Sequence, residues 1–215
     1  MEHRLFHAGT AMEMKSHWEQ VYRSKPVDSV SWYQPHAQRS LDLIRRVAGG
    51  HDARILDVGG GASTLADDLL DAGMTRVSVL DISGSALEAA RQRLGPRASK
   101  VRWIEGDITS LELEPASVDV WHDRAVFHFL TDPKDRGAYV RQVRRAVRPG
   151  GHVIIAAFSP EGPPQCSGLP VVRYAPEELH AQFGSAFELV DHQTEDHRTP
   201  SGAIQHFVYC LCVMH

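Results

Sequence analysis

The chain has 215 residues, of which 42% are hydrophobic and 23% are charged, a composition that is typical of one globular domain and excludes a disordered chain. Acidic residues outnumber basic ones by 27 to 23, and this balance argues against a nucleic-acid-binding protein. No run approaches the ~20 apolar residues that span a bilayer, and the three cysteines, Cys166, Cys210 and Cys212, are too few for a disulfide framework. We therefore expect a cytoplasmic protein that binds neither nucleic acid nor membrane.

Two helical patterns, at 16–25 and 36–47, open the chain and flank the aromatic stretch Ser31-Trp32-Tyr33-Gln34. Apolar runs then alternate with amphipathic segments, which predicts a parallel sheet with helices on both faces. The predicted strands are 53–58, 76–81, 101–108, 118–122 and 152–158, and the predicted helices are 64–72, 85–94, 133–147 and 176–183. Two last strands, 187–195 and 205–213, have no helix between them and predict an antiparallel hairpin at the sheet edge. The expected fold is a doubly wound, seven-stranded, mostly parallel α/β sheet.

Three glycines, Gly59, Gly60 and Gly61, follow the first predicted strand and offer bare backbone to a ligand. The carboxylate of Asp57, two residues before them, can accept hydrogen bonds from a cationic amino-acid ligand but would repel a pyrophosphate. A dinucleotide fingerprint would require glycine at position 64, where Thr64 stands. The alternative is a tight strand-to-helix turn that binds no ligand.

Two more acids stand at predicted strand ends. Asp81 follows Asp57 by 24 residues, a spacing at which a carboxylate meets ribose hydroxyls, and Ile82 comes next. The alternative for Asp81 is to cap the following helix. Asp107 can accept a hydrogen bond from the exocyclic amine of adenine while Ile108 packs on the ring. Like charges at three neighbouring strand ends repel one another unless a ligand with donors or positive charge lies among them.

Over about residues 15–213 the sequence resembles the class I S-adenosylmethionine-dependent methyltransferases, which have a Rossmann-like sheet. Asp57, Gly59 and Gly61 match the first motif of the family. Asp81 matches its ribose-binding acid, and Asp107 matches its adenine-contacting acid. The turn before its fifth strand is matched by Val147-Arg148-Pro149-Gly150-Gly151. The final hairpin matches the reversed edge strand of the family. Ser63 departs from the pattern, because another glycine is common there. The resemblance implies S-adenosylmethionine as the cofactor.

Aromatic side chains before the first predicted strand are candidates for a lid over the cleft: Trp18, Tyr22, Trp32 and Tyr33. Trp32 is also a candidate cofactor contact, because an aromatic ring attracts a cationic sulfonium. Trp18 and Tyr22 lie four residues apart on a helix and are explained equally well as core residues.

The expected organisation is a flexible leader followed by one domain. The leader is 1–14 and the methyltransferase domain is 15–215. Within the domain we expect a helical and aromatic lid at 15–50, a cofactor-binding core at 51–158, and an acceptor-side loop with the edge hairpin at 159–215.

The fourth predicted strand should deliver its last residues beside the transferable methyl group. His122, Asp123 and Arg124 are the candidate catalytic residues there, because neighbouring histidine and carboxylate groups can take a proton from a thiol, hydroxyl or amine. The alternative is that Asp123 and Arg124 form an ion pair with a structural role. Methyl transfer itself requires mainly alignment and removal of water from the acceptor.

A second resemblance concerns the acceptor. The stretches Asp123-Arg124-Ala125, Asp132 to Tyr139 and Gly162-Pro163-Pro164 resemble the thiopurine and thiol methyltransferase branch. It implies a small-molecule acceptor such as a thiol, sulfide or related chalcogen compound. Protein lysine N-methylation and a non-catalytic cofactor-binding module are the alternatives, and the chain is expected to be a monomer or homodimer.

Cys166 raises a further alternative, a thiophilic metalloid held together with Cys210 or Cys212. The latter two alternate along an apolar strand and are explained more simply as buried packing residues. The thirteen histidines show no metal-ligand spacing, so no metal is expected.

Overall fold

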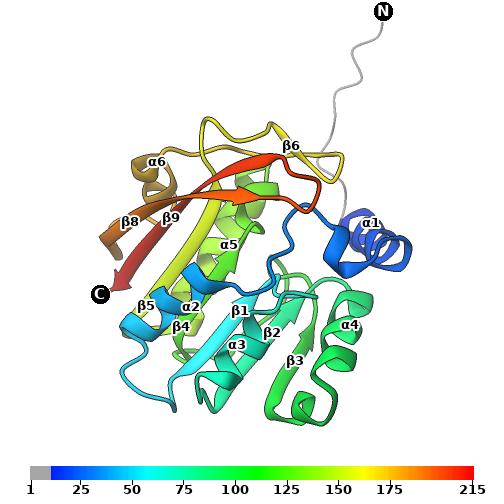
Figure 1. The fold of residues 1–215 in the computed structure, drawn as a ribbon. Coiled ribbons are helices and arrows are strands. Elements are labelled where there is room, and N and C mark those ends of the chain that lie inside the picture. The colour runs from blue at the N-terminus through cyan, green and yellow to red at the C-terminus, as the bar shows by residue number, and fades with distance from the viewer. Residues whose placement is uncertain (1–10) are drawn as a thin grey trace, which may run out of the picture.

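A seven-stranded sheet lies at the centre of the structure, with helices on both faces (Figure 1). The computed structural model describes residues 11–215. The strand order is β3-β2-β1-β4-β5-β9-β8, in which β9 runs antiparallel to both neighbours and the other pairs are parallel. The predicted fold class and its edge hairpin are thereby confirmed.

The strands of this sheet are β1 (Arg54–Val58), β2 (Arg76–Asp81), β3 (Val101–Glu105), β4 (Val118–Arg124), β5 (Val147–Phe158), β8 (Phe187–Arg198) and β9 (Ile204–Met214). The helices are α1 (Ala11–Ser24), α2 (Gln38–Val47), α3 (Leu65–Asp71), α4 (Gly84–Leu94), α5 (Pro133–Ala146) and α6 (Pro176–Ala181). A short hairpin of β6 (Gln165–Cys166) and β7 (Leu169–Pro170) lies between β5 and α6 in the sequence. Of these helices, none is long and apolar enough to cross a bilayer.

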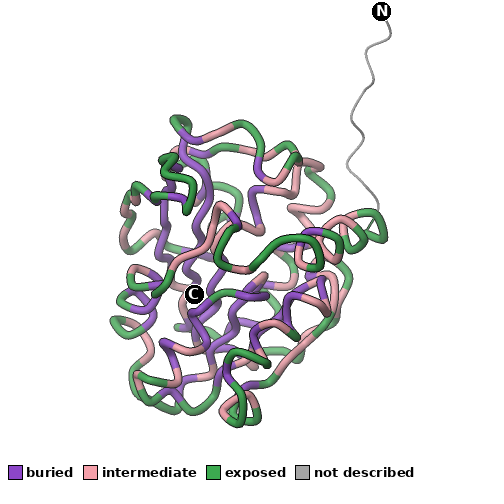
Figure 2. Tube along the Cα trace, turned by 45° about the vertical axis from the view of Figure 1, so that its right-hand side comes forward, coloured by how far each residue is buried: buried purple, intermediate pink, exposed green. Residues whose placement is uncertain are grey.

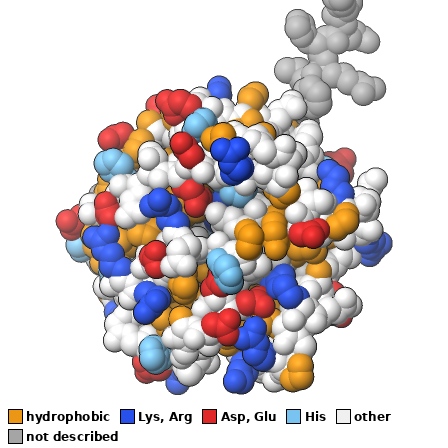
Figure 3. Space-filling model, viewed as in Figure 1, with side chains coloured by type: hydrophobic (Ala, Val, Ile, Leu, Met, Phe, Trp, Pro, Cys, Tyr) orange, Lys and Arg blue, Asp and Glu red, His pale blue; other side chains and the backbone are white. Residues whose placement is uncertain are grey.

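Two hydrophobic clusters pack on opposite faces of the sheet, because side chains alternate along each strand. Ile55 of β1 belongs to the cluster covered by α2, α3 and α4, whereas the next residue, Leu56, belongs to the cluster covered by α5 and α6. Figure 2 shows the buried strands running through the middle of the molecule. On the face in Figure 3, acidic and basic side chains are interspersed.

Local signals account for the start of the helices that border the site. The Ser83 hydroxyl accepts a hydrogen bond from the Ala86 amide at 3.2 Å and so caps α4. Asp132 caps α5 in the same way at the Lys134 amide, and Pro133 occupies the first turn, where its missing N–H costs nothing.

Several element boundaries differ from the prediction. Helix α1 begins at Ala11 rather than Ser16, so residues 11–14 of the expected leader are helical, while residues 1–10 lie outside the described part of the chain. Strand β3 ends at Glu105 instead of residue 108, because the next amide, that of Gly106, bonds the Asp81 carbonyl and a turn follows.

The two strands beside the centre are longer than predicted. Strand β4 continues through Arg124, and β5 begins at Val147 rather than His152. The pairing of β4 with β5 shifts register between Val118 and Val120, so the Pro149-Gly150-Gly151 segment lies within a strand as an irregularity.

Candidate functional site

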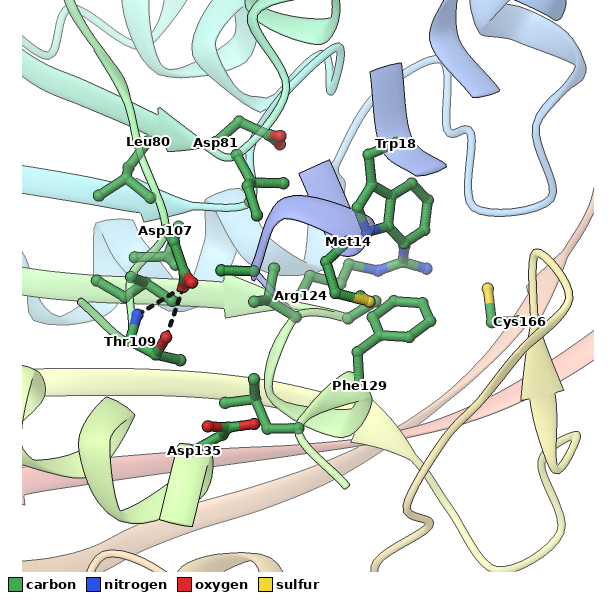
Figure 4. A pocket seen from close by; sticks show the side chains of 18 of the residues that line it. Met14, Trp18, Leu80, Asp81, Asp107, Thr109, Arg124, Phe129, Asp135 and Cys166 are labelled. Carbon is green, nitrogen blue, oxygen red and sulfur yellow. Dashed lines mark hydrogen bonds between the residues drawn. The ribbon is translucent and has the colours of Figure 1, made fainter. Parts of the chain in front are cut away.

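A cavity of about 380 Å³ opens above the carboxyl ends of the parallel strands. This is the edge at which open α/β sheets bind ligands, and the volume lies in the range of small-molecule sites. Asp81 and Asp107 lie toward one end, and Trp18, Phe129 and Cys166 lie toward the other (Figure 4). The cavity therefore has a carboxylate end and an aromatic end.

The glycine turn after β1 requires glycine for both conformation and space. Gly59 and Gly61 have φ values of +67° and +34°, a region that other residues rarely adopt. A Cβ at Gly59 would overlap the Val126 side chain, and one at Gly60 would overlap the Asp57 carboxylate. A Cβ at Gly61 would lie 2.6 Å from Asp81 Oδ2. The turn thus brings its backbone against two carboxylates.

Asp81 ends β2 and lines the cavity although it is only 7% exposed. Its Oδ1 accepts a hydrogen bond from the Ser83 amide at 2.8 Å. Burial raises the pKa of Asp81 to about 7, and the negative charge of nearby Asp57 acts in the same direction. A ligand with hydroxyl donors or positive charge would offset the desolvation and charge repulsion that disfavour the ionised carboxylate. Ile82 lines the same cavity.

Asp107 also lines the cavity, from the loop after β3. Its Oδ1 accepts two hydrogen bonds from Thr109, from the amide and from the hydroxyl, each at 2.8 Å. These bonds fix the carboxyl group in one orientation. Ile108 follows as a buried, cavity-lining side chain beside it.

Asp57 lies elsewhere than expected. It lines a second, smaller cavity of about 50 Å³ together with Gly60. The two cavities share four lining residues: Tyr22, Trp32, Gly59 and Arg124. The three strand-end acids are therefore divided, with two in the main cavity and Asp57 in the adjoining one.

Neither His122 nor Asp123 lines the main cavity, although His122 lines the smaller one. His122 is 2% exposed, and its ring nitrogens are bonded to Asp57 and Ser40. Asp123 is 0% exposed and lines neither cavity. It accepts hydrogen bonds from the amides of Val126 and Phe127 at 2.8 and 3.1 Å and from the Tyr139 hydroxyl at 2.6 Å. Alternation along β4 turns Asp123 toward α5, away from its two neighbours.

Arg124 is the one candidate catalytic residue that lines the main cavity. It does not pair with Asp123. Its Nε donates to the Tyr209 hydroxyl at 2.9 Å, its Nη2 to Glu195 Oε2 at 3.3 Å, and its guanidinium lies 4.2 Å from the ring centre of Phe207. These contacts hold a buried cation at the boundary of both cavities.

Aromatic rings from α1 and the following loop cover the cavity. Trp18 lies edge-on to Trp32 and to Phe129, with ring centres 5.6 and 5.1 Å apart. Trp18, Tyr22 and Trp32 line the main cavity, whereas Tyr33 lines only the smaller one. The lid interpretation of Trp18 and Tyr22 is thus favoured over a role in the core.

Polar contacts attach α1 to the part of the sheet that carries β3 and α4. Glu19 accepts hydrogen bonds at 3.2 Å from the Ser83 hydroxyl and the Ser85 amide, and a further one from the Ser85 hydroxyl. Lys15 pairs with Glu105 at 2.5 Å. The first helix is therefore held across the start of α4 and the end of β3.

Residues 55–151 match the family model described as "Methyltransferase domain". They form a class I methyltransferase domain, whose cofactor is S-adenosylmethionine. A ubiquinone/menaquinone biosynthesis C-methyltransferase from Methylobacterium nodulans is 33% identical over 109 residues, which are 49% of this chain and 42% of that protein. A mouse protein named eEF1A lysine and N-terminal methyltransferase is 25% identical over 139 residues, 64% of this chain and 19% of that one. The chain thus spans less than half the length of these two relatives.

Solved structures share the fold of this methyltransferase domain. The 1,6-didemethyltoxoflavin-N1-methyltransferase of Burkholderia thailandensis, determined with S-adenosylhomocysteine, has a TM-score of 0.72 at 21% identity and covers 100% of this chain and 93% of its own. A methyltransferase from Anabaena variabilis has a TM-score of 0.74 at 15% identity, with 96% of each chain covered.

The residues of the methyltransferase domain fit the chemistry of this cofactor. Gly59 places bare backbone in both cavities, Gly60 does so in the smaller one, and the buried carboxylate of Asp81 lines the main cavity. Asp107 with Ile108 offers an acceptor beside an apolar side chain. A cationic nucleoside with a vicinal diol and an adenine ring matches these groups.

Cys166 lies at the aromatic end of the cavity, at 5% exposure, and burial raises the pKa of its thiol to about 11. Cys210 and Cys212 pack in the cluster on the opposite face of the sheet. The metalloid alternative required Cys166 to meet one of them in the cleft, and the sheet separates them.

Sequence reasoning missed several residues of the site. Phe158 ends the fifth predicted strand, so the strand-end argument used for the acids would have found it. Phe207 and Glu195 come from the hairpin and meet Arg124 only through the sheet topology. Ser40 and Tyr209 have no local signal, because each is one polar residue in an otherwise ordinary helix or strand.

Proposed function

We propose that this protein transfers the methyl group of S-adenosylmethionine to a small uncharged acceptor, with a thiol, sulfide or related chalcogen compound as the preferred class. The observation that carries the proposal is the main cavity, which has a carboxylate end and an aromatic end. In this proposal residues 15–50 cover the site, 51–158 hold the cofactor and 159–215 form the acceptor side. The reaction takes place in the cytoplasm, in a monomer or homodimer.

The cofactor contacts in this proposal are those that line the two cavities. Asp81 binds the ribose hydroxyls, Asp107 and Ile108 bind the adenine, and Ile82 packs beside them. The glycine turn and Asp57 hold the amino-acid part, and Trp32 contacts the sulfonium. The bound cofactor supplies an activated methyl group, so the protein contributes mainly alignment and exclusion of water.

The aromatic end favours a polarisable, uncharged acceptor. Trp18, Phe129, Phe158 and Phe207 line it, and they remove water from a sulfur nucleophile, which is weakly hydrated. Arg124 is the only one of the three predicted catalytic residues retained here. We assign it the orientation of the acceptor rather than proton removal, because a guanidinium stays protonated.

Methylation of a protein lysine is the second candidate, favoured by the similarity to the mouse eEF1A lysine and N-terminal methyltransferase. Here the cavity argues against it. A lysine side chain arrives from water as an ammonium ion, and the buried cation of Arg124 would repel it in a site of low dielectric.

The test supplies methyl-labelled S-adenosylmethionine to the purified chain. One set of reactions contains small thiols and sulfides, with a phenol and an alkylamine for comparison, and another contains cell lysate divided into small-molecule and protein fractions. We expect S-adenosylhomocysteine and label in the sulfur compounds or in the small-molecule fraction. Label confined to proteins would support the lysine alternative, and cofactor binding without any transfer would support a non-catalytic module.

A further inference from the structure

A chain of buried polar side chains crosses from the cofactor side of the site to its acceptor side, and the proposed function assigns a role only to its two ends, Asp57 and Arg124. It begins at Asp57, whose Oδ1 lies 2.7 Å from His122 Nδ1. The other ring nitrogen, Nε2, lies 2.8 Å from the Ser40 hydroxyl. Ser40 also lies beside the Tyr209 hydroxyl, close enough to act on the pKa of that group and lower it. The chain therefore joins strands β1, β4 and β9 through helix α2.

The far end of the chain is the cluster around Arg124. The Tyr209 hydroxyl donates to Glu195 Oε2 at 3.0 Å and accepts from Arg124 Nε at 2.9 Å. Glu195 also accepts from the Gln34 side-chain amide at 3.2 Å. Both charged groups are largely buried, with 10% of the Arg124 side chain and 13% of the Glu195 side chain exposed.

The interior members of the chain are shielded from solvent. Asp57, His122, Ser40 and Tyr209 are each at most 2% exposed. A buried polar group that loses its partner pays the full cost of desolvation, so each member holds the next one in place. An imidazole bonded at both nitrogens cannot flip or rotate without breaking a bond.

We propose that His122, Ser40 and Tyr209 are positioning residues that orient the Asp57 carboxylate and the Arg124 guanidinium together, and so couple cofactor binding to acceptor binding. This inference rests on the proposed function for the identity of the two ligands. Asp57 adjoins the glycine turn, and Arg124 lines both cavities, so the two ends of the chain are the groups that face the two ligands. When one ligand immobilises the side chain at its end of the chain, the side chain at the other end loses conformational freedom as well. The two binding events are then linked by a coupling free energy.

Tyr209→Phe is the sharpest variant, because it removes one hydroxyl from a residue that lines neither cavity. Isothermal titration calorimetry with S-adenosylmethionine should show Kd raised about three- to tenfold, the loss expected for one buried hydrogen bond. The matched control is Tyr139→Phe, which removes a hydroxyl buried on the opposite face, and it should leave Kd within about twofold. An unchanged Kd in Tyr209→Phe would overturn the proposal.

A double-mutant cycle separates coupling from general destabilisation. Asp57→Asn should weaken binding by itself, and adding Tyr209→Phe to it should cost little more, because the chain is already interrupted. Fully additive effects would contradict a connected chain. If Tyr209→Phe fails to fold by circular dichroism, Ser40→Ala takes its place in the same cycle.

A ligand-free readout keeps this inference distinct from the proposed function. The ring-nitrogen chemical shifts of His122 should change in Tyr209→Phe and stay unchanged in Tyr139→Phe. If the wild-type chain binds no S-adenosylmethionine, the proposed function fails, and these shifts still decide whether the chain is connected. Unchanged His122 shifts in Tyr209→Phe would show that it is not.

Discussion

Two buried carboxylates on neighbouring strands illustrate how different roles arise from similar sequence positions. Asp57 of β1 and Asp123 of β4 lie near strand ends, and the strands pair so that Asp57 is opposite His122 and Val58 is opposite Asp123. Asp57 faces a cavity beside the glycine turn. Asp123 faces the α5 side, where two amides and the Tyr139 hydroxyl satisfy it. A shift of one residue along paired strands thus separates a ligand-facing acid from a structural one.

The largest effect on binding should come from an acid that lines the main cavity. Asp81→Asn should raise Kd for S-adenosylmethionine about 10- to 100-fold, because hydrogen bonds to a charged group contribute about 1.5–3 kcal/mol. Thermal stability should change little or increase, because the variant removes a carboxylate whose ionised form is disfavoured by burial. Calorimetry at pH 8 measures the first quantity and differential scanning calorimetry the second. Binding of wild-type strength in this variant would place the cofactor elsewhere.

Replacement of Asp123, which lines neither cavity, should lower stability and leave cofactor affinity unchanged. Asp123→Asn should lower the free energy of unfolding by about 2–3 kcal/mol, because an amide cannot accept all three hydrogen bonds that the carboxylate accepts. Kd for S-adenosylmethionine should stay within about twofold. Urea titration and calorimetry on the same sample would check both. A large loss of affinity in a folded Asp123→Asn protein would restore Asp123 to the site.

Stability of the ligand-free protein and affinity for S-adenosylmethionine should depend on pH in opposite directions. Burial raises the pKa of Asp81 to about 7 and that of Asp123 to about 6, both above the ordinary value of 3.8. The folded state thus binds these protons more tightly than the unfolded chain, and these two groups should make the ligand-free protein more stable as pH falls from 8 to 6. Affinity should fall over the same interval, by up to about tenfold per pH unit, as Asp81 loses its charge.

Asp81→Asn is the control for this pH series. It should remove most of the pH dependence of Kd between pH 6 and 8, while Asp123→Asn should leave that dependence in place. Equal pH dependence in wild type and Asp81→Asn would assign the titration to another group.

The smallest effect is expected at the aromatic end. Cys166→Ser should leave Kd for S-adenosylmethionine within about twofold, because the thiol is neutral and distant from the acids in Figure 4. If only the KM for the acceptor changes, the result would agree with a cavity in which the carboxylate end binds the cofactor and the aromatic end binds the acceptor. A strong loss of cofactor affinity would show that the two ends are not separate sites.

Much of the fold was predictable because it depends on local periodicity. Strand β2 has the predicted bounds, and the edge hairpin followed from two apolar strands without an intervening helix. The acids Asp81 and Asp107 were predictable as cavity-lining residues because Asp81 ends β2 and Asp107 comes just after β3, and the carboxyl ends of both strands face the site. Such signals require only the order of elements along the chain.

The sequence could not predict to which face of the sheet each side chain of β4 points. Its residues are buried on both sides, so no polar and apolar alternation marks which face each side chain takes. The pairing of Arg124 with Glu195 joins residues 71 apart in sequence, and it depends on the antiparallel return of β9 and β8 beside β5. Such contacts follow from tertiary packing, which single-sequence patterns do not encode.

Titration of S-adenosylmethionine into the wild-type chain by calorimetry at pH 8 tests the central claim most directly. We predict saturable binding of one cofactor per chain, weakened by Asp81→Asn and unaffected by Asp123→Asn. No heat of binding at high micromolar cofactor, in a protein shown to be folded, would contradict the assignment of this cavity.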